Sequence, residues 1–430
     1  MENSVKIENT EYYGKKVEQS STQTSTQKLT WFEKIAHKTF SNLKRGHLVV
    51  QFPSGDIFEF GDSKSEIKAN ITIIKSDFFK KCFYHGDIGF GEAYVDGDWE
   101  TDSITKVISY MIYNLENHPT LSGSKKSPVK INFMKIANKF THFLRSNTIN
   151  GSRKNISEHY DLSNDFFNSF LDKNMLYSSG IFPANETTLD EAQIFKMEAL
   201  CKKLKLKPND HVLEIGSGWG GFATYAVKNY GCKVTTLTIS EEQFKFAKAR
   251  FEREGISDKV EIKMLDYRLM TGKFDKLVTC EMLEAVGHKF LPVFFAKCNE
   301  LLKDDGIMAH QVITCPDSRY DQLRTGVDWI QKHIFPGSLL PSVGAMNSAI
   351  AKTSDMYLHE LHDMGLDYAK TLRMWRQNFN SKLNDIRSLG FDEKFIRKWN
   401  YYLSYCEAAF QMRNISVVQI VYTRPNNLTI

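Results

Sequence analysis

Short apolar runs alternate with helix-like stretches from about residue 207 onward, and this alternation limits the folds open to the chain. The runs consist mainly of aliphatic and β-branched residues, as buried strands do. They cover residues 212–215, 233–238, 260–264, 277–280 and 307–312, and SVVQIVYTR near the C-terminus adds a last strand. We therefore predict an α/β fold, in which a doubly wound, mostly parallel sheet is covered by helices on both faces.

A glycine-rich loop, EIGSGWGG, directly follows the first of these strands and precedes a helix. Doubly wound sheets bind ligands at this edge, and glycine lets the backbone turn tightly and approach a ligand closely. The spacing E-x-G-x-G-x-G differs from the G-x-G-x-x-G of dinucleotide enzymes, and it resembles the cofactor loop of class I methyltransferases. A glycine loop alone also fits a purely structural turn, so its position after the first strand is what favours a cofactor site.

The N-terminal part of the chain has a different organisation. Residues 1–28 contain the tract SSTQTSTQ and few aliphatic side chains, which predicts a disordered tail. Residues 29–117 predict a small α+β domain, with a hairpin around Pro53-Ser54-Gly55 and a further strand in KANITIIKS. The next segment, FFKKCFYHGDIGFGEAYVDGDWE, predicts a helical turn followed by a glycine-punctuated loop.

Residues 118–157 predict a basic linker that contains an amphipathic helix. Asp and Glu are absent between residues 117 and 157, whereas Lys and Arg are frequent, and Ile131, Met134, Phe140 and Phe143 recur close to a helical repeat. This helix packs on the following domain, or it lies on an anionic bilayer, and the two uses are compatible. Because the net charge of the chain is only +5, this clustering indicates an anionic partner better than the total charge does.

The seven cysteines are scattered and never form a CxxC pair. Their pattern indicates reduced thiols in a cytoplasmic protein, without a disulfide framework or a metal site. No stretch of the sequence approaches the roughly 18 apolar residues of a membrane-spanning helix. An enzyme of this composition that acts on membrane lipids would work from the membrane surface, and we expect no nucleic-acid partner.

Several longer segments resemble one enzyme family, the cyclopropane fatty acyl phospholipid synthases and the related mycolic acid methyltransferases. The similar segments include HYDLSNDFFNSFLDKNMLYSSGIF, VLEIGSGWGGFATYA, EMLEAVGHKF, HIFPGSLLPS and YYLSYCEAAFQMRNISVVQIVY. In addition, GFGEAYVDGDWE resembles the small lipid-binding domain of the longer members. The resemblance covers about residues 45–425. It implies a small lipid-binding domain over 29–117 and a Rossmann-like class I methyltransferase domain over 158–430.

The resemblance also implies a reaction and a cofactor. S-adenosylmethionine would donate a methylene to the cis double bond of an unsaturated phospholipid acyl chain at an anionic membrane surface, which forms a cyclopropane fatty acid. The family's cofactor-binding positions correspond here to Tyr177, Ser178, Glu214, Gly216, Gly218, Trp219, Gly220, Thr238, Ser240, Gln243, Asp266, Tyr267 and Arg268. Ser240 and Gln243 also have the spacing of a helix N-terminus. The oligomeric state stays open, a homodimer included.

A base must remove one proton from the transferred methyl, and in the family a bound bicarbonate does so. The resemblance assigns the bicarbonate site to Ser179, Glu284, His310, Tyr368 and the backbone of Val312. Ser179 stands where the family commonly has cysteine, which puts the final ring closure in doubt. A methyl-branched, methylene or N-methyl product is therefore the alternative, and a lipid-binding protein without activity is the rival from another class.

Cys406 aligns with a cysteine that has been assigned to the active site in this family. The expected chemistry needs no thiolate nucleophile, and a buried cysteine commonly acts as a small hydrophobic residue. A catalytic role and a packing role for Cys406 are therefore both open from the sequence.

Overall fold

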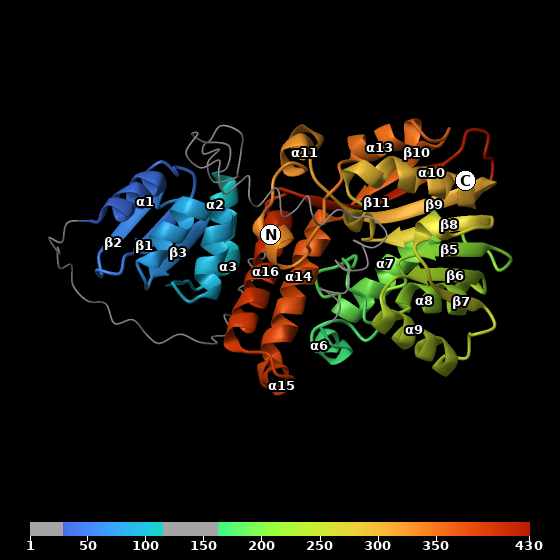
Figure 1. Cartoon of the computed structure of the whole chain (residues 1–430), viewed down its shortest axis with the longest axis horizontal. Coiled ribbons are helices and arrows are strands. Elements are labelled where there is room, and N and C mark those ends of the chain that lie inside the picture. The colour runs from blue at the N-terminus through green and yellow to red at the C-terminus, as the bar shows by residue number, and fades with distance from the viewer. Residues whose placement is uncertain (1–28, 115–161) are drawn as a thin grey trace, which may run out of the picture.

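The computed structural model describes residues 29–114 and 162–430. The predicted tail and the whole of the predicted basic linker lie outside the described residues. Two sheets are present, a four-stranded one near the N-terminus and a seven-stranded one in the rest of the chain. Helices α14 (Gly365–Ser381) and α16 (Glu393–Gln411) stand between the two sheets (Figure 1).

The small N-terminal sheet has the strand order β2-β1-β3-β4. Its strands are β1 (His47–Gln51), β2 (Ile57–Gly61), β3 (Lys68–Ile73) and β4 (Trp99–Glu100), and helices α1 (Trp31–Ser41) and α3 (Ile104–Tyr113) accompany them. β1 and β2 form the predicted antiparallel hairpin, whose turn is closed by a 2.8 Å hydrogen bond from the Phe52 N–H to the Asp56 carbonyl. The predicted third strand, β3, pairs parallel to β1.

The prediction of a helical turn and a loop after β3 was wrong. The segment is helical over α2 (Asp77–Val95), in which two helical stretches meet at a kink at Gly86, where φ is +59°. The glycines misled because one of them serves packing. A Cβ atom added at Gly91 would lie 2.5 Å from the Trp329 side chain and 2.8 Å from that of Tyr401, so only glycine permits this close approach.

The large sheet has the strand order β10-β11-β9-β8-β5-β6-β7. Its strands are β5 (His211–Ile215), β6 (Lys233–Thr238), β7 (Val260–Met264), β8 (Phe274–Cys280), β9 (Leu302–Thr314), β10 (Tyr357–Asp363) and β11 (Ser416–Thr423). β5 to β9 pair in parallel, whereas β11 and β10 pair antiparallel at one edge. The predicted strands are confirmed. β10 was missed because this edge strand is mostly exposed and its sequence, YLHELHD, lacks an apolar run.

Helices cover the large sheet on both faces, as predicted. Alternate residues of each strand point to opposite faces, so Val212 packs against α7, α8 and α9, whereas Leu213 packs against α10 and α13. These helices are α7 (Leu189–Lys203), α8 (Gly221–Tyr230), α9 (Glu241–Arg253), α10 (Leu291–Leu301) and α13 (Val343–Ala351). Shorter helices are α6 (Asn164–Asn168), α11 (Asp317–Leu323), α12 (Trp329–His333), α15 (Leu383–Ser388), η3 (Tyr267–Leu269), η4 (Leu283–Ala285) and η5 (His288–Phe290).

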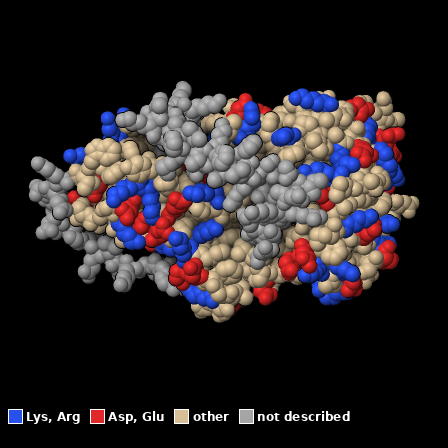
Figure 2. All heavy atoms as spheres, in the orientation of Figure 1, with Lys and Arg blue, Asp and Glu red and all other residues tan. Residues whose placement is uncertain are grey.

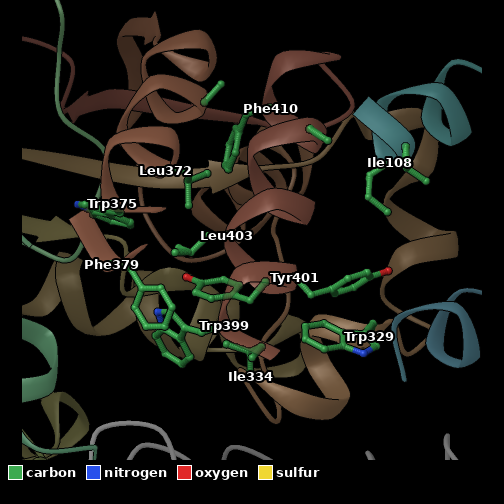
Figure 3. Close-up of a cluster of buried hydrophobic side chains, with 14 of the residues drawn as sticks. Ile108, Trp329, Ile334, Leu372, Trp375, Phe379, Trp399, Tyr401, Leu403 and Phe410 are labelled. Atoms are coloured by element: carbon green, nitrogen blue, oxygen red, sulfur yellow. The ribbon is translucent and has the colours of Figure 1, made fainter. Parts of the chain in front are cut away.

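The four-stranded sheet and helices α1, α2 and α3 form the small domain. It packs against α16 and α12 through a continuous hydrophobic core. Figure 3 shows Trp329, Tyr401 and Ile108 in this core, together with side chains of α14 and α16. Polar contacts accompany the packing: Thr105 Oγ1 donates to Glu407 Oε2 at 3.0 Å, and Arg397 pairs with Glu100 at 2.6 Å. Within the described ranges, no helix has both the length and the apolar character required to cross a membrane.

Candidate active site

The glycine loop lies at the carboxyl end of β5 and forms one end of a large cavity. Gly216 and Gly218 line this cavity and have φ values of +99° and +49°, which favour glycine. A Cβ atom at Gly218 would meet nothing within 4 Å, so the loop is open on that side. At Gly220, by contrast, an added Cβ atom would lie 2.8 Å from Phe251, and this glycine lets α8 pack closely on α9.

Most of the predicted cofactor residues come together around this end of the cavity. The lining includes Tyr177, Ser178, Glu214, Gly216, Gly218, Trp219, Thr238, Gln243, Asp266, Tyr267 and Arg268. Ser240 lies outside the lining. It caps α9 by accepting a hydrogen bond from the Gln243 N–H, which confirms the predicted helix N-terminus.

Two carboxylates give this end of the cavity an acidic character. Glu214 accepts a 2.6 Å hydrogen bond from Thr236 Oγ1. Burial raises the pKa of Glu214 to about 8, although that hydrogen bond and the charge of Lys196 act in the opposite direction. Asp266 accepts two hydrogen bonds from the Arg268 side chain, at 2.8 and 2.7 Å, and one from its backbone N–H at 3.0 Å. A cation placed beside Glu214 would favour the ionised carboxylate, so this end fits a cofactor that carries ammonium and sulfonium charge.

The cavity has a volume of about 1150 Å³ and extends from the glycine loop to helices α1 and α2 of the small domain. Aromatic and aliphatic side chains form most of its wall beyond the cofactor end, among them Phe335, Tyr402, Phe410, Phe83 and Phe40. Near the cofactor end, the hydroxyl groups of Tyr177 and Tyr402 are 2.8 Å apart. The site therefore combines a polar head with a long apolar body, and residues of both domains form its wall.

Glu281 lies in the wall directly after β8 and was not predicted from the sequence. Its carboxylate accepts three hydrogen bonds, from the Ser179 N–H at 2.9 Å, Gln311 Nε2 at 2.8 Å and the Tyr368 hydroxyl at 2.7 Å. Burial raises the pKa of Glu281, and these hydrogen bonds oppose that rise. The available signal was a second acidic residue beside Glu284 in the segment CEMLEAVG, at the strand end where ligands of such sheets bind.

Glu284 lines the same cavity, one helical turn away in η4. Its Oε1 atom accepts a 2.5 Å hydrogen bond from the Ile313 N–H, and its buried Oε2 atom has no hydrogen-bond partner among the described residues. Burial and the negative charge of Glu281 raise the pKa of Glu284 to about 8. The structure therefore brings Glu284 and Tyr368 together, with Glu281 close to both.

His310 and the Val312 side chain lie on the other face of the sheet. His310 Nδ1 is 2.8 Å from Thr279 Oγ1, and its ring packs against Phe294, Phe295 and Tyr422. Burial lowers the pKa of His310 to about 3, so the imidazole is neutral. The prediction that His310 binds an anion in the cavity is therefore corrected, because strand alternation points Gln311 towards Glu281 and its two neighbours away from it.

The predicted bicarbonate site does not fit the side chains as they stand. The Ser179 hydroxyl donates to the Gly180 carbonyl at 3.0 Å and is not part of the cavity lining. The expected donor Tyr368 gives its hydroxyl hydrogen bond to Glu281, and the Ser179 N–H donates to the same carboxylate. A bicarbonate would have to displace the Glu281 carboxylate, because two neighbouring negative charges disfavour binding beside it.

Cys406 lies on α16 and lines the cavity, but it has no anion-stabilising surroundings. Burial raises its pKa well above the usual range of a thiol, and the charge of Asp328 adds to this effect. A thiolate is therefore disfavoured, and the position suits a wall residue rather than a nucleophile. Within residues 29–114 and 162–430, no group of three or more His, Cys, Asp or Glu side chains is placed to hold a metal ion.

Comparison with known proteins identifies the family. The sequence model described as mycolic acid cyclopropane synthetase matches residues 148–420. The chain belongs to this family. Tuberculostearic acid methyltransferase UfaA1 of Mycobacterium tuberculosis is 36% identical over 346 residues, which cover 78% of this chain and 78% of the relative. Cyclopropane-fatty-acyl-phospholipid synthase of Escherichia coli is 36% identical over 359 residues, which cover 83% of this chain and 88% of the relative.

Solved structures agree with this assignment to the cyclopropane synthetase family. Mycolic acid cyclopropane synthase CmaA1, solved with SAH and CTAB, matches with a TM-score of 0.58 at 28% identity, over 63% of this chain and 98% of that one. The seven-stranded sheet is therefore a class I methyltransferase fold, and this family member is an S-adenosylmethionine-dependent methyltransferase.

Proposed function

We propose that this methyltransferase transfers a one-carbon group from S-adenosylmethionine to the cis double bond of an unsaturated phospholipid acyl chain and forms a cyclopropane fatty acid. The observation that carries the proposal is the cavity of about 1150 Å³, which joins the glycine loop to an apolar channel that reaches the small domain. Its volume exceeds the roughly 300–1,000 Å³ of ordinary small-molecule sites, so a cofactor and an acyl chain have room end to end.

The walls of the cavity suit the chemistry of an alkene. An isolated double bond is a weak nucleophile, so it must be aligned with the sulfonium methyl and kept from water. Methyl transfer leaves a carbocation in the acyl chain, and aromatic faces attract cations. Tyr177 and Phe335 both line the cavity, with ring centroids 6.5 Å apart. These rings support a role in aligning the chain and stabilising the cation.

The bicarbonate base of the expected reaction does not fit this site, because the Ser179 N–H and the Tyr368 hydroxyl are bonded to Glu281. One proton must still leave the transferred methyl. The carboxyl groups of Glu281 and Glu284 line the cavity and are candidate bases.

We also propose that the enzyme works from the membrane surface, with the small domain as its lipid-facing end. Phe32, Phe83 and Tyr84 line the cavity where α1 and α2 meet. Beside them, Trp31 is 60% exposed and Tyr84 is 50% exposed, and the Trp31 ring lies 4.9 Å from that of Phe32. Exposed Trp and Tyr side chains favour the membrane interface, so a lipid has an apolar route from the bilayer into the cavity.

A methylene-branched fatty acid is a second candidate product, supported by the tuberculostearic acid methyltransferase relative and by Glu281. The tuberculostearic acid methyltransferase relative is as similar to this chain as the cyclopropane synthase of Escherichia coli is, at 36% identity each. Glu281 also alters the predicted bicarbonate site. A methylene-branched chain therefore remains the alternative to the cyclopropane, since the same proton loss without ring closure produces it.

The proposal is tested by incubating the purified full chain with S-adenosylmethionine and vesicles of a cis-unsaturated phospholipid, followed by mass spectrometry of the fatty acids. We expect a gain of one CH2. Catalytic hydrogenation of the product then separates the two candidates, because a methylene-branched chain takes up hydrogen readily whereas a cyclopropane requires harsher conditions. If the fatty acids gain no carbon while an added amine becomes methylated, the lipid assignment is wrong.

A further inference from the structure

The bonding of Glu281 is that of a bound anion rather than of an ordinary wall residue. Its three donors come from separate parts of the chain: the Ser179 N–H precedes α7, Gln311 lies on β9, and Tyr368 lies on α14. Gln311 is itself held in place, since its Nε2 atom also donates to the Ser179 carbonyl at 3.0 Å and its Oε1 atom accepts from Gln419 at 3.1 Å. The protein thus builds an oxyanion pocket and fills it with its own carboxylate.

The backbone of Glu281 has an unusual conformation. Its φ is +51°, in the left-handed region that glycine favours and that other residues rarely occupy. The Glu281 N–H bonds to the Gln311 carbonyl at 2.7 Å, which fixes this conformation at the end of β8. A glutamate in a backbone conformation that favours glycine points to a role for its side chain.

Glu281 lies close to the cofactor loop. β8 is the neighbour of β5 in the sheet, so Glu281 follows the end of one strand and Gly216 the end of the next. The side chain of Met282, the next residue, lies 3.3 Å from the point where a Cβ atom of Gly216 would stand. Glu281 therefore lines the cavity at the cofactor loop, where the reactive methyl and the alkene must meet.

We propose that the Glu281 carboxylate is the base that removes the proton from the transferred methyl, so that this enzyme turns over without bicarbonate. The inference rests on the proposed function and names the proton acceptor of that same site. The alkene π electrons form a bond to the methyl carbon while the C–S bond breaks, which leaves S-adenosylhomocysteine and a carbocation. A methyl proton then passes to a Glu281 oxygen, and its C–H electron pair closes the ring.

The surroundings of Glu281 suit this role. Burial raises its pKa, which makes the carboxylate a stronger base, whereas the three hydrogen bonds hold it in a fixed orientation. Glu284 has a pKa raised to about 8, so near neutral pH it is largely the neutral partner and leaves the negative charge on Glu281. The three hydrogen bonds that Glu281 accepts favour its ionised form, whereas the Glu284 Oε2 atom has no hydrogen-bond partner among the described residues.

The test measures methyl transfer by the full chain to vesicles of dioleoyl phosphatidylglycerol, in buffer freed of carbon dioxide and in buffer with added bicarbonate. The unaltered protein should have the same rate in both. Glu281→Gln fills the same space and offers no base, so its rate should fall about 100-fold or more in both buffers. The affinity for S-adenosylhomocysteine, measured by calorimetry, should stay unchanged and shows that each variant is folded.

Glu281→Gly provides the matched variant, because glycine suits the backbone conformation and empties the oxyanion pocket. The Ser179 N–H, the Gln311 side-chain amide and the Tyr368 hydroxyl should then donate their hydrogen bonds to a bound bicarbonate. We expect this variant to be nearly inactive in the carbon dioxide-free buffer and to regain activity with added bicarbonate, whereas Glu281→Gln should not. A residue with a merely structural role would show no such rescue.

Three results would overturn the inference: bicarbonate dependence of the unaltered protein, full activity of Glu281→Gln, or failure of bicarbonate to restore Glu281→Gly. Failure of the proposed function looks different. In that case the unaltered protein transfers no methyl to lipid in either buffer, although it binds S-adenosylhomocysteine.

Discussion

The alternation of side chains along β9 determines which residues reach the cavity. Gln311 and Ile313 lie on the face of the strand that meets Glu281 and Glu284, whereas His310 lies among the rings packed against α10. The sequence indicated the segment correctly but not the face, because the strand is buried on both faces and both contain apolar residues. Glu281 was missed for a related reason, since its partners are distant in sequence and meet only in the folded chain.

Glu284 makes the stability of the unliganded protein depend on pH. Its pKa is about 8 in the folded state and about 4.3 when unfolded. Between these values the folded state binds more protons, so stability falls as pH rises, by up to about 1.4 kcal/mol per pH unit for one group. Glu284→Gln removes this loss. The melting temperature of the variant, relative to the unaltered protein, should be higher at pH 8 than at pH 5 by at least about 2 °C.

Calorimetry at the two pH values checks this prediction. Glu252→Gln, at an exposed position on α9, serves as the matched control and should shift the melting temperature equally at both. An equal shift for Glu284→Gln would mean that Glu284 is ionised throughout and would contradict the described burial.

At the scale of elements, the parallel strands and their helices were predictable because their periodicity is local. β5 to β9 and the β1–β2 hairpin lie where apolar runs and turn residues indicate them. α2 and β10 were not predictable in the same way. The glycines of α2 are explained by a tertiary contact with Trp329, and β10 pairs only with β11 and has few buried residues. Features that depend on contacts between distant segments, such as α2 and β10, could therefore not be predicted from the sequence.

Glu407 on α16 links the small domain to the helix pair between the sheets. Its side chain is 2% exposed, pairs with Arg373 at 2.8 Å and Arg376 at 2.7 Å, and accepts a hydrogen bond from Thr105 of α3. Glu407→Leu leaves these groups without their acceptor. Because the two arginines are partly exposed, we expect a loss of about 2 kcal/mol in the free energy of unfolding, below the 3–5 kcal/mol of a fully buried pair.

Denaturant unfolding of the full chain measures the effect. Glu393→Leu, at the first turn of the same helix, removes an exposed ion pair with Arg387 and should cost less than about 1 kcal/mol. If both variants lose the same stability, Glu407 does not hold the domains together.

At the scale of the whole molecule, one cavity is shared by two domains. The methyltransferase sheet supplies the cofactor end, and α14, α16, α1 and α2 supply further parts of the wall. Figure 2 shows basic and acidic side chains interspersed over the described part of one face. Opposite charges also pair in the small domain, where Lys81 contacts Asp96 and Asp98. The proposed attraction to a membrane therefore rests, among the described residues, on the exposed aromatic side chains Trp31 and Tyr84.

The double variant Trp31→Ala with Tyr84→Ala should weaken binding of the protein to phospholipid vesicles, because both side chains leave the exposed rim of the cavity. Sedimentation with sucrose-loaded vesicles measures this. Tyr357→Ala, which removes a 45% exposed aromatic side chain from the edge strand β10, is the matched control and should bind as the unaltered protein does. Equal loss of binding in both variants would reject the small domain as the lipid-facing end.

S-adenosylmethionine that carries a CD3 group tests whether the enzyme transfers a methyl to an acyl double bond and whether that methyl then loses one proton. Mass spectrometry of the fatty acids counts the deuterium atoms on the added carbon. We predict that the acyl chain gains one carbon with two deuterium atoms, the third having passed to the base. A product with all three deuterium atoms would show that the transferred methyl loses no proton. Label found only outside the acyl chain would show that the acyl chain is not the methyl acceptor.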